Sequence, residues 1–225
     1  MLIKHRLPLL LLPVVLLLSE NFLPFLSSVP SVAQAVAQAA AQAAPSVSPK
    51  RGQMIVSTRT PKQGTWPIEL TVSLFVEVPQ QILWGILTDY ESLPDFVPYL
   101  EECTIVDRVK NRVYIEEVFS CFPLTMRLDL EIKEEPPNRT VFKRYSGNMK
   151  VYEGSWEIDP VSPETSIFTL KVKAQPDFPV PQKVLTWILK TEIPKGMLEM
   201  RKQALTVSGQ REPRYSIEVL SRQDF

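Results

Sequence analysis

One long helical pattern near the end of the chain constrains the fold more than any other feature of the sequence. Over residues 181–205, largely apolar side chains recur every three or four positions, as on one face of a helix. This face comprises Val184, Trp187, Ile188, Thr191, Met197, Leu198, Arg201, Ala204 and Leu205. An isolated helix of this length is marginal in water, so we expect the face to pack against the concave side of a curved antiparallel sheet. Pro181 suits the first turn, whereas Pro194 and Gly196 predict a kink or break near residues 191–194, so that the helix forms two rods.

The segments before this helix have the patterns of strands. From residue 68 to 76, apolar and polar residues alternate, which indicates a strand with one buried face. A helix opened by Pro79 follows at about 80–88, and two prolines, Pro94 and Pro98, limit residues 89–98 to a short helical turn or loop. Six further strands are predicted at about 100–109, 113–121, 124–134, 140–146, 150–159 and 165–175. We therefore predict an α+β fold, with a seven-stranded curved antiparallel sheet wrapped around the C-terminal helix and two short helices after the first strand.

The first 44 residues have the layout of a signal peptide. Basic residues at positions 4–6 precede an apolar run at 7–18, and small-x-small motifs such as Ala33-Gln34-Ala35 follow. The run is shorter than the roughly 20 apolar residues that a bilayer span needs. We expect export to a periplasm, a lumen or the exterior; an uncleaved membrane anchor and a transit peptide are the alternatives. Residues 45–65 are predicted to be a linker, 66–208 the folded domain and 209–225 a C-terminal tail.

Charge and histidine content exclude several classes of function. Lysine plus arginine equals aspartate plus glutamate at 25 each, so there is no basic excess for binding nucleic acid. The sole histidine, His5, lies in the predicted leader. The domain therefore lacks the imidazole of serine-type triads and of histidine zinc sites, and we expect neither a metal nor a cofactor.

Two cysteines and three pairs of glutamates are candidates for chemistry. A tight turn at residues 110–111 would pair Cys103 with Val118 and place Cys103 and Cys121 on different faces, whereas a one-residue longer loop would reverse this. We expect free, buried thiols. Adjacent glutamates occur at 101–102, 116–117 and 134–135, but neighbours on a strand point to opposite faces. At most one of each pair can face a cavity, so no glycosidase arrangement follows.

Several short motifs occur in a fixed order along the chain. They are Val78-Pro79-x4-Trp84, Asp89-Tyr90-x3-Pro94-x-Phe96-x-Pro98, Gly147, Gly154-Ser155-Trp156, Pro176 with Val180-Pro181, and Leu198-Glu199-Met200-Arg201. Together they resemble the polyketide cyclase/dehydrase and coenzyme-Q-binding branch of the START-like (SRPBCC) superfamily. The resemblance implies a helix-grip fold, in which the sheet and the last helix enclose a deep pocket for an apolar ligand. It does not fix the chemistry, because members of the family include lipid carriers, quinone binders and ring cyclases.

The candidate ligand-binding residues come from three segments of this predicted pocket. The apolar face of residues 124–132 is either core or pocket wall. A two-residue turn at 147–148 would place Tyr145, Tyr152 and Trp156 on one face, where they suit the polar end of a lipophilic ligand or form an ordinary aromatic cluster. The predicted ligand-binding residues are Phe96, Leu124, Met126, Leu128, Leu130, Tyr145, Tyr152, Trp156, Trp187 and Ile188. Phe178 and Val180, beside Trp187, form either a gate or membrane-facing foot, or pack against residues 93–99.

Three functional hypotheses follow. The leading one is a monomeric, non-catalytic binder or carrier of a lipophilic small molecule such as a quinone, an isoprenoid or a lipid. The second is an enzyme of the cyclase or dehydratase type that uses Tyr145, Tyr152 or Asp89 as acid or base; it predicts a carboxylate or tyrosine with a shifted pKa facing the cavity. The third is an assembly factor that holds a membrane-protein partner, or a membrane surface, through Phe178 and Trp187.

Overall fold

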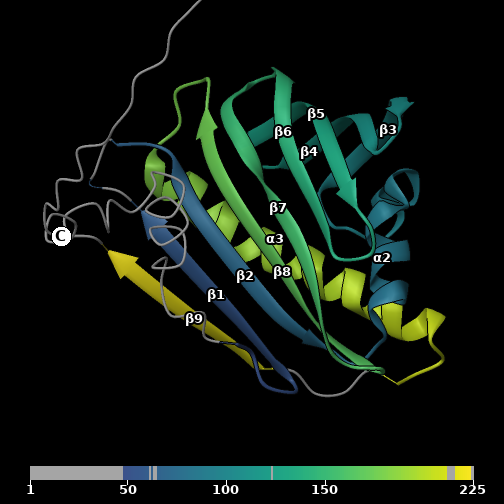
Figure 1. Cartoon of the computed structure of the whole chain (residues 1–225). Helices are drawn as coiled ribbons and strands as arrows, with labels where there is room; N and C mark the ends of the chain where they lie inside the picture. Colours follow the sequence, from purple (N-terminus) through teal and green to yellow (C-terminus); the bar gives the residue numbers. More distant parts are fainter. Residues whose placement is uncertain (1–47, 61, 63–64, 123, 212–215, 224–225) are drawn as a thin grey trace, which may run out of the picture. The chain divides into compact units, whose positions relative to one another are not determined.

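A single large sheet dominates the computed structural model, which describes residues 48–60, 62, 65–122, 124–211 and 216–223 (Figure 1). The described part of the chain contributes nine strands in the spatial order β3-β4-β5-β6-β7-β8-β2-β1-β9. The strands are β1 (Gln53–Thr60), β2 (Ile68–Val76), β3 (Leu100–Val109), β4 (Arg112–Cys121), β5 (Leu124–Glu135), β6 (Arg139–Gly147), β7 (Met149–Ser162), β8 (Thr165–Pro176) and β9 (Ser216–Gln223). Neighbours are antiparallel, except that β1 and β9 run parallel. The leader predicted at 1–44 lies outside the described residues.

Two short helices and one long helix accompany the sheet. Helix α2 (Gln80–Thr88) and the 3-10 helix η1 (Tyr90–Asp95) connect β2 to β3, and α3 (Gln182–Val207) follows β8. Figure 1 shows α3 running along one face of the curved sheet. The predicted α+β class, the curved sheet and the long C-terminal helix are confirmed. None of the helices in the described residues is both long enough and apolar enough to cross a membrane.

The prediction of seven strands was wrong, because the expected linker contains β1 and the expected tail contains β9. The three apolar residues Met54, Ile55 and Val56 are almost fully buried where β1 pairs with β2. This apolar run is too short to stand out among the polar residues that flank it. In β9, Ile217 and Val219 are more than half exposed, so this edge strand is held mainly by backbone pairing with β1.

The prediction that α3 is broken into two rods was also wrong. It is a continuous helix of 26 residues with Pro194 buried inside it. An interior proline costs a helix roughly 3 kcal/mol. Packing offsets this cost, since Leu185 and Leu189 before the proline and Met197 after it are all buried.

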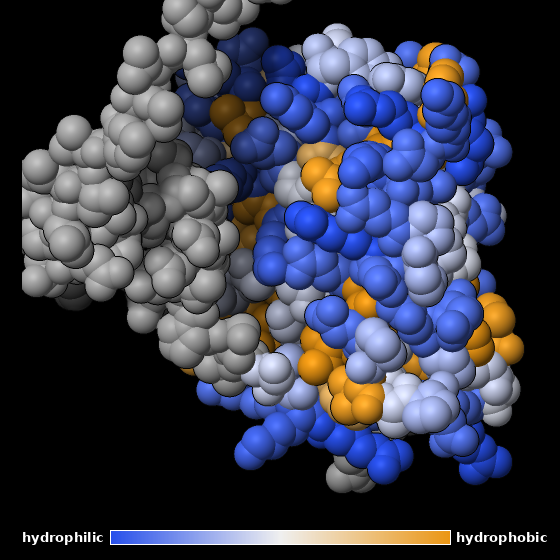
Figure 2. All heavy atoms as spheres, in the orientation of Figure 1, coloured by the Kyte–Doolittle hydropathy of each residue, from blue (hydrophilic) through white to orange (hydrophobic). Residues whose placement is uncertain are grey.

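The two faces of the sheet differ sharply in polarity. On the face toward α3, β2 buries every second residue, namely Ile68, Leu70, Val72, Leu74 and Val76. On the opposite face, oppositely charged side chains pair across strands, as between Lys171 and Glu157 or Lys173 and Glu69. Figure 2 shows mainly hydrophilic residues in the view of Figure 1, with hydrophobic ones scattered among them.

A buried ion pair fastens the end of α3 to the end of β2. The Arg201 side chain is completely buried, and its Nη2 donates to Glu77 Oε2 at 2.9 Å. Arg51 approaches the other oxygen of Glu77, with 3.9 Å between Nε and Oε1. A charge without a partner would be costly at this depth, so each of these groups depends on the other.

Candidate functional site

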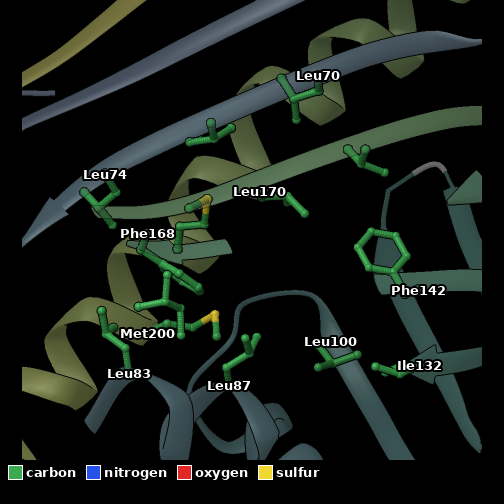
Figure 3. Packing of buried hydrophobic residues seen from close by; sticks show 14 of the residues in the cluster. Leu70, Leu74, Leu83, Leu87, Leu100, Ile132, Phe142, Phe168, Leu170 and Met200 are labelled. Carbon is green, nitrogen blue, oxygen red and sulfur yellow. The ribbon is translucent and has the colours of Figure 1, made fainter. Parts of the chain in front are cut away.

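A cavity of about 140 Å³ lies between the concave face of the sheet and α3. Its walls come from α2, η1 and the loop after it, strands β3 to β8, and the middle of α3. Figure 3 shows Leu87, Leu100, Ile132, Phe142, Leu170 and Met200 around a common space. Other lining residues are Tyr90, Leu93, Val97, Pro98, Tyr99, Glu117, Phe119, Cys121, Met126, Leu130, Tyr152, Trp156, Ile188, Leu189, Glu192, Ile193, Gly196 and Met197. The site is thus an apolar chamber with a few polar groups, the usual composition of a small-molecule pocket.

Five of the predicted ligand-binding residues line this cavity: Met126, Leu130, Tyr152, Trp156 and Ile188. Three others, Phe96, Leu124 and Leu128, do not; Leu128 is fully buried in the surrounding core. Trp187 is 55% exposed on α3, and Tyr145 is 52% exposed. The predicted gate residues Phe178 and Val180 are partly buried and lie outside the cavity lining. Asp89, the carboxylate of the enzyme hypothesis, is exposed between α2 and η1.

The predicted face of Tyr145 was wrong because the register of β6 and β7 differs by one residue from the expected one. The structure pairs Phe142 with Gly154 and Thr140 with Trp156, and Phe142, Tyr152 and Trp156 all line the cavity. A bulge in β6, opposite the step from Asp129 to Leu130, accompanies this change. Tyr145 instead packs edge-on against Tyr114, with 6.0 Å between ring centroids. A one-residue shift turns a side chain to the other face of a sheet.

Bulges also decide where the cysteines lie. Irregularities between β3 and β4 pair Cys103 with Glu117, so the expected pairing with Val118 was wrong. Cross-strand partners share a face, and Glu117 and Cys121 both line the cavity, so both thiols are on the inner side of the sheet. The prediction of free, buried thiols is confirmed. Burial raises the pKa of both; for Cys103 the charges of Glu117 and Glu91 add to the effect, and for Cys121 the charge of Glu192 does.

Glu117 is the polar cavity residue that the sequence reasoning missed. Its carboxyl group lies among apolar walls, and burial raises its pKa from 4.5 to about 8. No side-chain hydrogen bond or ion pair connects it to another residue in the described chain. The signal was the alternation of β4: Val113, Ile115, Phe119 and Cys121 all face inward, which places position 117 on the same face.

Tyr152 lies in the same cavity as Glu117. Its ring is 5.5 Å from that of Phe142, centroid to centroid. Burial raises the pKa of the Tyr152 hydroxyl, and the charge of Glu117 raises it further. Within the described residues, the hydroxyl has no side-chain hydrogen-bond partner.

Two other ionisable groups in the wall, Tyr90 and Glu192, are already paired. The Tyr90 hydroxyl donates to Glu134 Oε1 at 3.1 Å, and Arg108 binds the same carboxylate. Lys195 Nζ donates to Glu192 Oε1 at 3.0 Å. Glu117 and Tyr152 are therefore the polar groups best placed to contact a ligand.

One rim of the cavity is formed where α3 meets the loop between η1 and β3. The Lys195 ammonium lies 5.7 Å from the ring centroid of Tyr99, which is 40% exposed. One residue further along α3, a Cβ atom added to Gly196 would lie 3.3 Å from Val97 Cγ1. The absence of a side chain at Gly196 thus lets the loop approach the helix closely.

This geometry defines a START-like protein of the helix-grip class: a curved sheet, a long C-terminal helix and an apolar cavity between them. A model of the family described as polyketide cyclase / dehydrase and lipid transport matches residues 76–201, more than half of the chain. The protein belongs to this family. No cluster of three or more potential metal ligands occurs in the described part of the chain.

Solved structures of distant sequences share the fold. The Zhui aromatase/cyclase from Streptomyces sp. R1128 is 11% identical at a TM-score of 0.58, with 64% of this chain and 98% of that one covered. The protein TTHA0849 from Thermus thermophilus is 19% identical at 0.58, covering 62% and 99%. A STAR-related lipid transfer protein from Xanthomonas axonopodis is 12% identical at 0.56, covering 65% and 90%. No curated protein matches the sequence significantly.

Proposed function

We propose that this protein binds a lipophilic small molecule, such as a quinone, an isoprenoid or a lipid, in the cavity between the sheet and α3, without catalysing a reaction. The observation that carries the proposal is the cavity itself, a space that larger side chains could have filled. Protein interiors are ordinarily packed as densely as organic crystals, so a void of this size is maintained at a cost in stability. The family description includes lipid transport, and one structural neighbour is described as a lipid transfer protein.

The size of the cavity limits how much of a ligand it encloses. A cavity of about 150 Å³ in another protein holds benzene, and typical ligand pockets span about 300–1,000 Å³. At about 140 Å³, this cavity encloses one or two rings or a short chain. A longer ligand requires the rim between residues 93–99 and α3 to open.

Ligand extraction tests the proposal directly. The protein is purified without detergent, extracted with organic solvent and analysed by mass spectrometry, with a parallel extraction of the Leu130→Trp variant. Leu130 lines the cavity and is 2% exposed, so an indole at this position fills the space. We expect a lipophile in stoichiometric amount from the wild type and none from the variant. A folded wild-type protein that carries no lipophile and does not bind the neutral fluorescent probe N-phenyl-1-naphthylamine would contradict the proposal.

A second candidate function is an acid/base reaction of the cyclase or dehydratase type. The observation that favours it is a carboxyl group with a pKa of about 8 in the apolar cavity, since a general acid or base works best when its pKa is near the ambient pH. In this reading Glu117 acts with Tyr152, one of the three groups named in the enzyme hypothesis, and replaces Tyr145 and Asp89. Dehydration of a β-hydroxy ketone, followed by absorbance, tests it: Glu117→Gln should abolish turnover and retain binding. Equal turnover by the variant would contradict the enzyme reading.

We further propose that the domain is exported, as its first 44 residues predict, and that it meets a membrane surface or a membrane-protein partner there. Trp187, at 55% exposure, and Phe122, at 94%, are large exposed apolar residues that support such a contact. Fractionation of the expressing cells, with N-terminal sequencing of the mature protein, tests the export.

A further inference from the structure

Two polar groups of the cavity, the carboxyl of Glu117 on β4 and the hydroxyl of Tyr152 on β7, face the same apolar space. Neither has a side-chain hydrogen-bond partner among the described residues. Both side chains are partly buried, and polar groups that are removed from bulk water are nearly always hydrogen-bonded to the protein or to an ordered molecule. A pair of such groups inside a ligand-sized cavity therefore points to a partner that the ligand supplies.

The chemistry of the two groups defines what this partner must be. Burial holds the Glu117 carboxyl in its neutral form up to a pH of about 8, and a neutral carboxyl carries one O–H donor. The Tyr152 phenol, whose pKa is raised by burial, also keeps its proton. At neutral pH the cavity thus presents two O–H donors. A carbonyl oxygen has two lone pairs and can accept from both.

We propose that Glu117 and Tyr152 form a carbonyl-binding pair, so that the ligand is an uncharged lipophile with a ring ketone or similar carbonyl at its enclosed end. The assignment rests on the proposed function, because it names the chemical class of the ligand in that same cavity. In this assignment the apolar walls provide affinity for any small lipophile, and the pair provides specificity for those that carry a carbonyl.

Charged ligands fit the surroundings of Glu117 less well. The groups that face this region are Cys103 on β3, Cys121 on β4, Tyr152 on β7, Tyr90 in η1, which is bonded to Glu134, and Glu192 on α3, which is bonded to Lys195; the wall residues of β5 and β6 are apolar. No cation in this set is left to neutralise a carboxylate or phosphate ligand. An amine ligand would require a second buried charge, and desolvation of a buried ion pair commonly outweighs its attraction.

Three probes that share one ring system test the pair. They are indane, 1-indanone, which adds a carbonyl, and 1-aminoindane, which adds an amine. Dissociation constants are measured by NMR titration of the full-length protein at pH 6 and pH 9. For the wild type at pH 6 we expect 1-indanone to bind about tenfold more tightly than indane, as two net hydrogen bonds imply. At pH 9 Glu117 is ionised and repels the carbonyl oxygen, so this preference should fall to about threefold or less.

Variants separate the pair from the rest of the cavity. Glu117→Gln keeps an N–H donor and cannot ionise, so the preference for 1-indanone should persist at both pH values. Glu117→Leu and Tyr152→Phe should each reduce it severalfold, measured as the ratio of the dissociation constants of indane and 1-indanone for the same variant. The Tyr145→Phe variant is the matched control, because Tyr145 lies outside the cavity lining.

The possible outcomes distinguish this inference from the proposed function. If indane and 1-indanone bind equally at pH 6, or if 1-aminoindane binds more tightly than 1-indanone at pH 6, the carbonyl-binding pair is overturned and the lipophile-binding function stands. If none of the three binds, the proposed function is overturned, and the pair with it.

Discussion

The two halves of the sheet have the same alternation of inward and outward residues, but their inward side chains have different surroundings. In β1 and β2, the inward side chains pack against α3; Met54 and Leu74, for example, have no exposed surface. In β4 to β6, the inward side chains border the cavity, and one of them is the carboxyl of Glu117. The alternation determines which side chains point inward. Whether they meet other side chains or an open space depends on where α3 passes.

The two halves also treat buried charge differently. In the packed half, Glu77 is fixed by Arg201 at 2.9 Å. In the cavity half, Glu117 has no such partner in the described residues, and burial raises its pKa to about 8. A partner and a shifted pKa are the two ways to tolerate a buried carboxyl, and only the second leaves the group available to a ligand.

The largest effect is expected in the packed half, from Arg201→Ala. The substitution leaves Glu77, which is 5% exposed, with Arg51 at 3.9 Å as its remaining counter-charge among the described residues. Removing one partner of a buried pair typically costs about 3–5 kcal/mol, and urea denaturation should show a loss of that size. The double variant Glu77→Leu/Arg201→Met should recover most of it. A loss below about 1 kcal/mol for Arg201→Ala would mean that the packed half does not depend on this pair.

In the cavity half, the substitution Glu117→Gln should stabilise the protein, by an amount that depends on pH. The folded state raises the pKa of Glu117 from 4.5 to about 8, so its neutral form is favoured and wild-type stability falls as the pH rises between these values. The neutral amide removes this loss. We expect equal stabilities near pH 4 and an advantage for Glu117→Gln on the order of 3 kcal/mol at pH 9, measured by urea denaturation across this range. Glu116→Gln, on the same strand with an exposed side chain, is the control and should show no such trend.

The sequence predicted the elements well and the details of the site less well. Strict alternation and prolines located β2 to β8 and α2 to within a few residues, because these signals are local. The edge strand β9 was missed because pairing with β1 stabilises it more than burial of its own side chains. Tyr145 was placed on the wrong face because a bulge shifted the register, and bulges leave little trace in a single sequence.

Glu117 was missed for a different reason. Strand geometry excludes the glutamate pairs as catalytic dyads, but it allows one member of each pair to face the cavity, and no prediction was made for these single residues. Yet the inward neighbours Ile115 and Phe119 already indicated the direction of position 117. A lone carboxylate within an otherwise apolar inward set is a useful signal in any fold that encloses a cavity.

A volume test compares two neighbouring inward positions of β5. Leu130 lines the cavity, whereas Leu128 is fully buried and does not line it. Overpacking of a filled core typically costs about 1–3 kcal/mol, whereas a side chain added beside a void finds space. Leu128→Phe should therefore lose about 1–3 kcal/mol in thermal or urea denaturation, and Leu130→Phe less than about 1 kcal/mol while weakening ligand binding. Equal losses would indicate that the surroundings of Leu130 are packed as tightly as those of Leu128.

The smallest effect on stability, but a specific effect on ligand exchange, is expected at the rim. Lys195 joins Glu192 on α3 to Tyr99 in the loop before β3, with Glu192 lining the cavity. Lys202 forms a comparable pair with Glu199 one helical segment further on, where neither residue lines the cavity, and so provides a matched control. Lys202 and Glu199 are both exposed, and such pairs contribute about 0–1 kcal/mol, so Lys202→Ala should unfold close to the wild type. Glu192 is only 9% exposed, so Lys195→Ala should cost slightly more, about 1 kcal/mol. Only Lys195→Ala removes a contact that closes the rim, and stopped-flow displacement of N-phenyl-1-naphthylamine should then show faster dissociation, by about twofold to fivefold. Because the two variants lose the same kind of ion pair, an equal rate in both would show that the ligand leaves by another route.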